Sequence, residues 1–278
     1  MYDEALEAMD AVAGSKAELA RRRPLATVLH AAMAGVYVGF GILLIFLLGA
    51  PFSAAGSPGT PLVMGATFGI ALSLVVFAGS DLFTGNTLVM TSAALRRKIA
   101  WPAALRAMGL SYLGSLAGAM ALAWLALRAG SFDKEPAHAF VVAVAAKKIG
   151  LGFWPLFFRG ILCNWLVTLA VWSTFRMKTE AGKLTMIFWC LLGFIGSGYE
   201  HSVANMTLLT LANLLPHGPE VSWLGMAKNL VPVTLGNFLS GAVCMAGAYG
   251  YVTGRATRPA ATVTAIETAG PSTRPKAA

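Results

Sequence analysis

The chain has 278 residues, of which 57% are hydrophobic and only 12% are charged. A soluble protein needs more polar side chains to cover its surface, so this composition excludes a soluble chain and predicts an integral membrane protein. The net charge of +9 is compatible with nucleic acid, an acidic membrane surface or small anions as partners, and the positions of the charges must distinguish these classes.

The first segment, 1–23, carries five acidic residues ahead of Arg21, Arg22 and Arg23. It therefore has neither the basic start nor the apolar core of a secretory signal. Leu6, Met9, Ala13 and Leu19 fall on one helical face, which predicts an amphipathic cytoplasmic segment lying beside the membrane; a frayed tail is the alternative.

Six apolar stretches follow, each long enough to cross a bilayer, in which about 20 residues suffice. They make up a transmembrane channel domain over 24–254, with spans at 26–48, 61–95, 105–127, 156–175, 184–215 and 230–252. The remaining segment, 255–278, is rich in Thr, Ala and Pro, and we expect a disordered cytoplasmic tail there.

The second and fifth spans are unusually long, and Gly and ionisable residues interrupt both of them, at 79–86 and 196–205. The first three spans also resemble the last three, since 113–118 in span three matches 235–241 in span six. Because three is an odd number of crossings, the second copy enters the membrane upside down. The sequence thus predicts an all-α protein with an inverted 3+3 repeat and a substrate path between the two broken helices.

The basic residues indicate the orientation. With the N-terminus inside, 15 of the 21 Lys and Arg residues fall in cytoplasmic segments, which predicts that both termini are cytoplasmic. Topology therefore accounts for most of the basic excess, and nucleic acid is not needed as a partner.

Three ionisable residues lie in the breaks: Asp81, Glu200 and His201. Charges at membrane depth are costly and usually functional, although each acid could simply accept hydrogen bonds and support its loop. His201 begins a new half-helix, where an imidazole can donate a hydrogen bond to an anion or hand it a proton. The three cysteines have no paired spacing, so neither a disulfide framework nor a metal site is expected.

Large apolar residues surround the breaks, namely Phe68, Leu72, Leu82, Phe83 and Phe194. Most such residues in a membrane protein serve packing. Apolar constrictions also gate pores by excluding water, and that reading would leave His201 in a dry chamber.

Three separated motifs resemble the signatures of the formate/nitrite transporter family: Asp81-Leu82-Phe83-Thr84-Gly85, the stretch 164–172 beginning Asn164-Trp165, and the stretch 198–206 containing Glu200-His201. Within the family, 64–72 and 162–165 are most similar to the bacterial nitrite channel branch. The resemblance implies a homopentamer of aquaporin-like protomers in the bacterial inner membrane, each protomer with its own pore and no cofactor.

The resemblance also implies roles for individual residues. Leu72, Leu82 and Phe83 would form the cytoplasmic constriction, and Phe68 and Phe194 the periplasmic one. His201 would be the central pore histidine, with Thr84, Asn164 and Asn205 as polar neighbours. Lys148 falls on the basic vestibule position, with Lys147 beside it as the other candidate.

These expectations together predict a channel or transporter for passive or proton-coupled passage of small monovalent anions, with nitrite as the first candidate. Formate or hydrosulfide is the alternative within the family. A membrane-embedded enzyme using Glu200 and His201 is a remote alternative, because no second catalytic carboxylate or cofactor motif accompanies them. A neutral-solute channel of aquaporin type would carry paired Asn-Pro-Ala signatures, which are absent. The expected partners are a small anion, the lipid bilayer and further copies of the chain.

Overall fold

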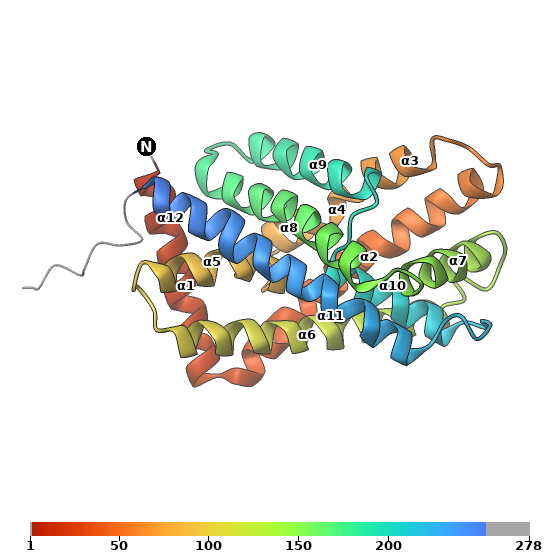
Figure 1. Cartoon of the computed structure of the whole chain (residues 1–278), viewed down its shortest axis with the longest axis horizontal. Helices are drawn as coiled ribbons and strands as arrows, with labels where there is room; N and C mark the ends of the chain where they lie inside the picture. The colour runs from red at the N-terminus through yellow and green to blue at the C-terminus, as the bar shows by residue number, and fades with distance from the viewer. Residues whose placement is uncertain (1, 254–278) are drawn as a thin grey trace, which may run out of the picture.

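The computed structural model describes residues 2–253, and every regular element in that range is a helix (Figure 1). The predicted tail at 255–278 lies outside the described residues. In chain order the helices are α1 (Asp3–Arg22), α2 (Pro24–Ala54), α3 (Thr60–Thr67), α4 (Gly69–Phe77), α5 (Phe83–Leu95), α6 (Trp101–Arg128), α7 (Ala137–Ile149), α8 (Phe153–Arg176), α9 (Glu180–Gly196), α10 (Ser202–Leu214), α11 (Trp223–Leu239), the π-helix η1 (Ser240–Gly247) and α12 (Ala248–Val252).

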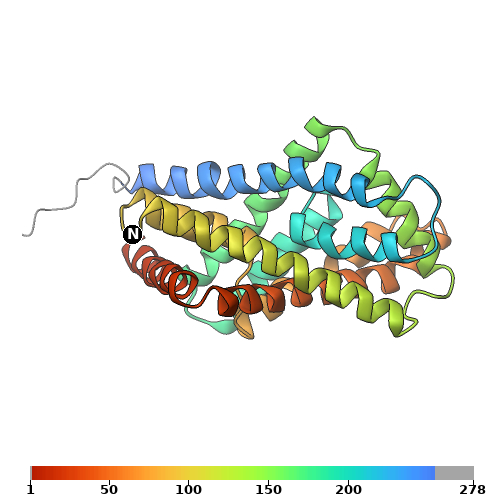
Figure 2. The ribbon, with the colours of Figure 1, turned by 90° about the horizontal axis from the view of Figure 1, so that it is seen from below.

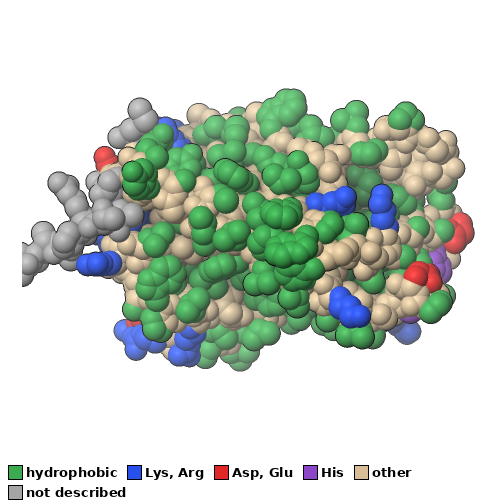
Figure 3. Space-filling view, viewed as in Figure 1, with side chains coloured by type: hydrophobic (Ala, Val, Ile, Leu, Met, Phe, Trp, Pro, Cys, Tyr) green, Lys and Arg blue, Asp and Glu red, His purple; other side chains and the backbone are tan. Residues whose placement is uncertain are grey.

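Within residues 2–253, five helical runs are long and apolar enough to cross a membrane: α2, α3 with α4, α6, α8, and α11 through α12. Figure 2 shows α6 and the last run extending along the long axis of the molecule, with α1 at one end. Many large apolar side chains on these helices are exposed, and they cover much of the face seen in Figure 3. Such a surface suits lipid or further protein rather than water.

Small residues bring the long helices into close contact. A Cβ atom at Gly118 of α6 would overlap the backbone of Ala32 in α2, and one at Gly236 of α11 would overlap the backbone of Phe157 in α8. Without a hydrophobic force between helices in lipid, this close approach supplies the van der Waals contact that holds them together. The pairs α2–α6 and α8–α11 form the frame that positions everything between them.

The two predicted interruptions are real breaks in the helices. Residues 78–82 separate α4 from α5, and residues 197–201 separate α9 from α10. Each break turns at a glycine in the left-handed region, Gly79 with φ of 72° and Gly198 with φ of 69°, which other residues adopt only with strain. The backbone then bonds a neighbouring long helix, since the Asp81 N–H donates to the carbonyl of His30 (3.4 Å) and the Glu200 N–H donates to the carbonyl of Arg159 (3.3 Å).

The helices α1 and α7 close the opposite ends of this frame. The apolar face of α1, with Leu6, Met9 and Ala13 fully buried, packs against α5, α6 and α8. This amphipathic helix thus covers one end of the bundle, and its place beside the membrane stays a prediction. At the other end α7, a helix that the sequence analysis did not predict, packs against α2, α10 and α11.

Candidate functional site

Three cavities lie in series through the interior between α1 and α7. The α7-side cavity has a volume of about 380 Å³ and is lined by Lys147, Lys148, Tyr199 and Asn205, among others. The α1-side cavity has a volume of about 350 Å³, and its lining includes Lys16 and His30. Between them lies a central chamber of only about 10 Å³, which is the space of a single water molecule.

The same side chains form the walls between neighbouring cavities. Phe194 and His201 line both the α7-side cavity and the central chamber, whereas Leu72 and Leu82 line both the chamber and the α1-side cavity. Phe68 lines the chamber and meets Phe194 edge to face, with ring centroids 5.5 Å apart. An ion crossing from one outer cavity to the other would therefore have to pass two apolar walls, with His201 on the wall nearer α7.

His201 is held by both ring nitrogens. The backbone N–H of Ala204 donates to Nδ1 (3.1 Å), so His201 caps the N-terminus of α10, and Nε2 lies 3.0 Å from the hydroxyl of Thr84. Because a backbone N–H can only donate, Nδ1 is the acceptor and the neutral imidazole carries its proton on Nε2. Nε2–H then donates to Thr84, which stands at the start of α5. The two half-helices thus meet at one hydrogen bond.

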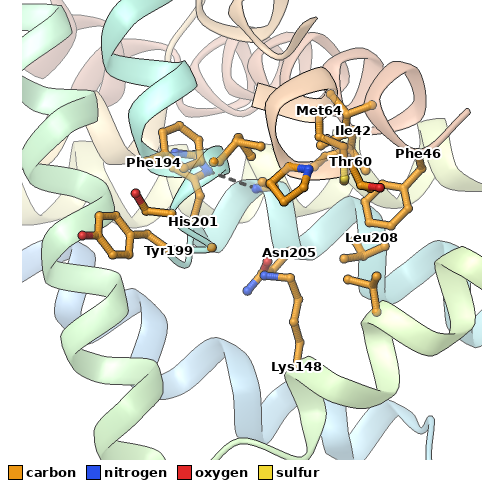
Figure 4. Close-up of a pocket in the computed structure, with 18 of the residues that line it drawn as sticks. Ile42, Phe46, Thr60, Met64, Lys148, Phe194, Tyr199, His201, Asn205 and Leu208 are labelled. Carbon is orange, nitrogen blue, oxygen red and sulfur yellow. Dashed lines mark hydrogen bonds between the residues drawn. The ribbon is translucent and has the colours of Figure 1, made fainter. Parts of the chain in front are cut away.

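The break beside His201 is stabilised by a buried ion pair. The Glu200 carboxylate is 1% exposed; its Oε1 lies 2.8 Å from Nζ of Lys148, and its Oε2 accepts a hydrogen bond of 2.6 Å from Asn205. Asn229 then accepts from Asn205 (2.9 Å) and donates to the backbone carbonyl of Lys148 (3.1 Å). Figure 4 shows Lys148 extending toward Asn205 beside the cavity.

The other break repeats this arrangement with different residues. The Asp81 carboxylate lies 2.7 Å from Nζ of Lys16 and accepts a 2.9 Å hydrogen bond from Asn86. Asn86 follows Asp81 by five residues, just as Asn205 follows Glu200. Ser111 stands where Asn229 stands in the first cluster, accepting from Asn86 and donating to the carbonyl of Asp81. A lysine from α1 or α7 thus neutralises the carboxylate of each break.

Two residues predicted for the pore lie away from it. Phe83 lines neither the chamber nor the α1-side cavity; its ring packs against Tyr112 (centroids 4.9 Å apart) and borders a surface groove along α6. Leu82 is the extended cap residue and Phe83 is the first residue of α5, and their side chains point to different sides: Leu82 lines the chamber, whereas Phe83 packs against Tyr112. Asn164 is fully buried and lines none of the three cavities; it donates to Thr87, to the carbonyl of Asn237 and, at 3.4 Å, to the carbonyl of Thr84.

The remaining predicted residues come together around the cavities. Phe68, Leu72, Leu82, Phe194, Asn205 and both lysines, Lys147 and Lys148, line one cavity or another, and Thr84 contacts His201 directly. Of the two lysines, Lys148 forms the ion pair with Glu200. All three cysteines are free thiols. In residues 2–253 no three His, Cys, Asp or Glu side chains gather where they could hold a metal ion.

The sequence analysis missed Lys16, Asn86 and His30. A signal for Asn86 existed, because Asp81 and Glu200 are each followed five residues later by an asparagine at corresponding places in the two breaks. Lys16 could not be found in this way, since its contact with Asp81 joins segments far apart in the sequence and depends on how α1 docks.

The chain is similar to known transport proteins. Residues 3–251 match the family model described as Formate/nitrite transporter. The chain is 43% identical over 261 residues to the nitrite transporter NirC of Escherichia coli (strain K12), covering 94% of this chain and 96% of that protein. It is 35% identical over 254 residues to a probable formate transporter of Methanothermobacter thermautotrophicus, covering 84% of this chain and 92% of the relative.

Two solved structures are similar over most of their length. One, described as an FNT family ion channel, superposes with a TM-score of 0.85 at 43% identity and covers 89% of this chain and 98% of that chain. The other, a pentameric formate channel with formate bound, has a TM-score of 0.75 at 26% identity, with 84% and 98% covered.

Proposed function

The chain belongs to the formate/nitrite transporter family, a family of membrane transport proteins rather than enzymes, and from this premise we propose that it conducts nitrite through the three cavities described above. The observation that carries the proposal is the series of cavities whose dividing walls are shared side chains: Phe194 with His201, and Leu72 with Leu82. The substrate follows the 43% identical nitrite transporter.

The two apolar walls set the main energetic problem for the anion. A small anion loses most of its hydration there, at a cost that fixed donors must offset. One such donor is the hydroxyl of Thr84, which accepts the Nε2–H of His201 and keeps its own O–H for an anion. The first N–H groups of α5 have no side-chain cap, because Leu82 stands at the cap position, so they are free to face an anion.

Proton coupling is a second mode of the same path. A protonated His201 would give up the bond from the Ala204 N–H at Nδ1, and it could then pass its proton to the anion, which would cross the walls as a neutral acid. The walls favour a neutral species because the desolvation cost falls on the charged one. His201→Asn should then change both the rate and the pH dependence of nitrite flux while leaving slow anion passage.

The architecture proposed for the bilayer has six spans in an inverted 3+3 repeat. The matching clusters at Asp81 and Glu200 support it, as do the corresponding frame pairs α2–α6 and α8–α11. The distribution of the basic residues supports a cytoplasmic α1 side, and a bacterial inner membrane is proposed as the location. Assembly as a homopentamer is proposed from the pentameric formate channel with which this chain superposes.

Competitive anion flux in proteoliposomes tests the function. Nitrite uptake is measured against formate, acetate and hydrosulfide at two pH values, and wild type is compared with His201→Asn and with protein-free liposomes. We expect nitrite to be taken up fastest and acetate slowest. Uptake no faster than in protein-free liposomes would refute the proposal.

Formate is the second candidate substrate. The superposition on a formate channel with formate bound favours it, although that structure is only 26% identical. If formate is taken up faster than nitrite in the same assay, formate becomes the first candidate substrate.

A further inference from the structure

The α1-side cavity contains a histidine that the proposed path does not use. His30 of α2 lines this cavity, and its Nε2 lies 3.2 Å from the carbonyl oxygen of Gly79, the left-handed glycine of the first break. Its backbone carbonyl accepts the Asp81 N–H, so His30 contacts the break through both its ring and its main chain. A carbonyl can only accept, which fixes the proton of the neutral ring on Nε2.

The second ring nitrogen distinguishes His30 from His201. In His201 the Ala204 N–H occupies Nδ1, so protonation would cost that hydrogen bond. In His30, Nδ1 has no hydrogen-bond partner among residues 2–253, so it can take a proton while the bond to Gly79 stays in place. Histidine is the side chain whose charge ordinarily changes between pH 5 and 8. Along the path from α1, His30 is the first histidine that lines a cavity.

The charges around the two outer cavities make this histidine decisive. In the α7-side cavity Lys148 is balanced by Glu200, and Lys147 remains as a permanent extra cation. In the α1-side cavity Lys16 of α1 is balanced by Asp81 of the break, and the residues that α4, α5 and α8 contribute to the lining are uncharged. The charge of the α1-side cavity thus depends on His30 alone, among the described residues that line it.

We propose that the α1-side cavity is a second anion-binding site, in which protonated His30 holds a small monovalent anion beside Lys16. This inference rests on the proposed function and adds to it a recruitment step on the α1 side. On the α7 side the positive charge of Lys147 attracts anions at every pH in the test. On the α1 side anions are attracted only to the extent that His30 is protonated. Affinity for the anion from the α1 side therefore rises as the pH on that side falls.

The test measures the KM for nitrite from each side separately. Everted and right-side-out vesicles from expressing cells present opposite faces; the external pH is set to 6 or 8 with the interior buffered at pH 7, and uptake by vesicles lacking the protein is subtracted. In the orientation that exposes α1, the wild-type KM should rise about fivefold or more from pH 6 to pH 8, because a positive charge in a cleft concentrates anions. In the opposite orientation it should stay constant.

Two substitutions separate charge from structure. His30→Gln and His30→Arg both keep a side-chain N–H for the Gly79 carbonyl. His30→Gln should show the high wild-type KM at both pH values, and His30→Arg the low one. His138→Gln is the matched control, since His138 bonds the carbonyl of Pro216 on the α7 side and lines none of the three cavities.

A His30→Gln variant that keeps the wild-type pH dependence of KM would overturn the inference, as would a wild-type KM that does not change with pH on the α1 side. Failure of the proposed function looks different, because then wild-type vesicles of either orientation take up no more nitrite than vesicles lacking the protein.

Discussion

Removing Lys148 should destabilise the protein by leaving the Glu200 carboxylate without a cation. That carboxylate is 1% exposed and would keep only Asn205 as a side-chain partner. Breaking a buried ion pair on one side typically costs roughly 3–5 kcal/mol, and because Lys148 is itself 19% exposed we expect about 2–3 kcal/mol for Lys148→Met. A protein of this size then loses about 4–12 °C in Tm, which thermal unfolding in detergent, followed by tryptophan fluorescence, resolves readily.

The double variant Lys148→Met with Glu200→Gln separates the charge effect from lost packing. Glutamine keeps an oxygen that can accept from Asn205 and carries no charge, so at least half of the lost Tm should return. The matched cluster supplies the control: Lys16→Met, alone and with Asp81→Asn, should behave in the same way, because Asp81 is 3% exposed beside a lysine that is 23% exposed. If the double variant is as unstable as Lys148→Met, the cost comes from the buried lysine stem and the reasoning is refuted.

Three further predictions concern the walls, the central hydrogen bond and the frame. Leu82→Ala should open the wall between the chamber and the α1-side cavity and raise acetate flux relative to nitrite, whereas Phe83→Ala, which faces Tyr112, should leave this ratio unchanged in the same liposome assay. Thr84→Val keeps the shape but leaves the Nε2–H of His201 without its acceptor, and nitrite flux should fall about tenfold, equivalent to the roughly 1–3 kcal/mol of an unsatisfied buried donor; wild-type flux would show that the hydroxyl is dispensable. Gly118→Val should abolish folded protein on size-exclusion chromatography because its Cβ meets the Ala32 backbone, while Gly109→Ala on the same helix has open space and should be tolerated; equal yields would contradict the close packing of α2 on α6.

Local signals in the sequence predicted the long helices and both breaks. Apolar length defines a membrane helix, and a glycine next to an ionisable residue inside such a run has few explanations other than a break, as Gly79 with Asp81 and Gly198 with Glu200 illustrate. The residue types at the start of a helix do not determine the direction in which each side chain points. Phe83 was therefore misplaced, although its neighbour Leu82 faces the pore.

Contacts between distant segments were also beyond the sequence. The helix α7 is short and lies in a connection between spans, so its apolar residues gave no membrane signal, yet it is the element that delivers Lys148 to Glu200. Lys16 reaches Asp81 only because Leu6, Met9 and Ala13 seat α1 against the end of the bundle. Asn164 was expected beside His201, but its amide instead bonds the carbonyl of Asn237 on α11.

The half-helices α5 and α10 begin with the same backbone conformation but with different side chains at the cap position. This difference determines on which side of the chamber an anion meets an imidazole. Leu82 and His201 each stand at the cap position directly after the acidic residue of a break, both in an extended conformation, and both line the central chamber. At α10 the histidine ring satisfies the Ala204 N–H itself, whereas at α5 the leucine can satisfy nothing and contributes an apolar wall. The substitution Leu82→His would cap α5 and so remove the free N–H donors at its start. It would also make the wall between the chamber and the α1-side cavity polar. A symmetric fold therefore yields an asymmetric path, in which an anion meets an imidazole on one side of the chamber and uncapped N–H groups behind an apolar side chain on the other.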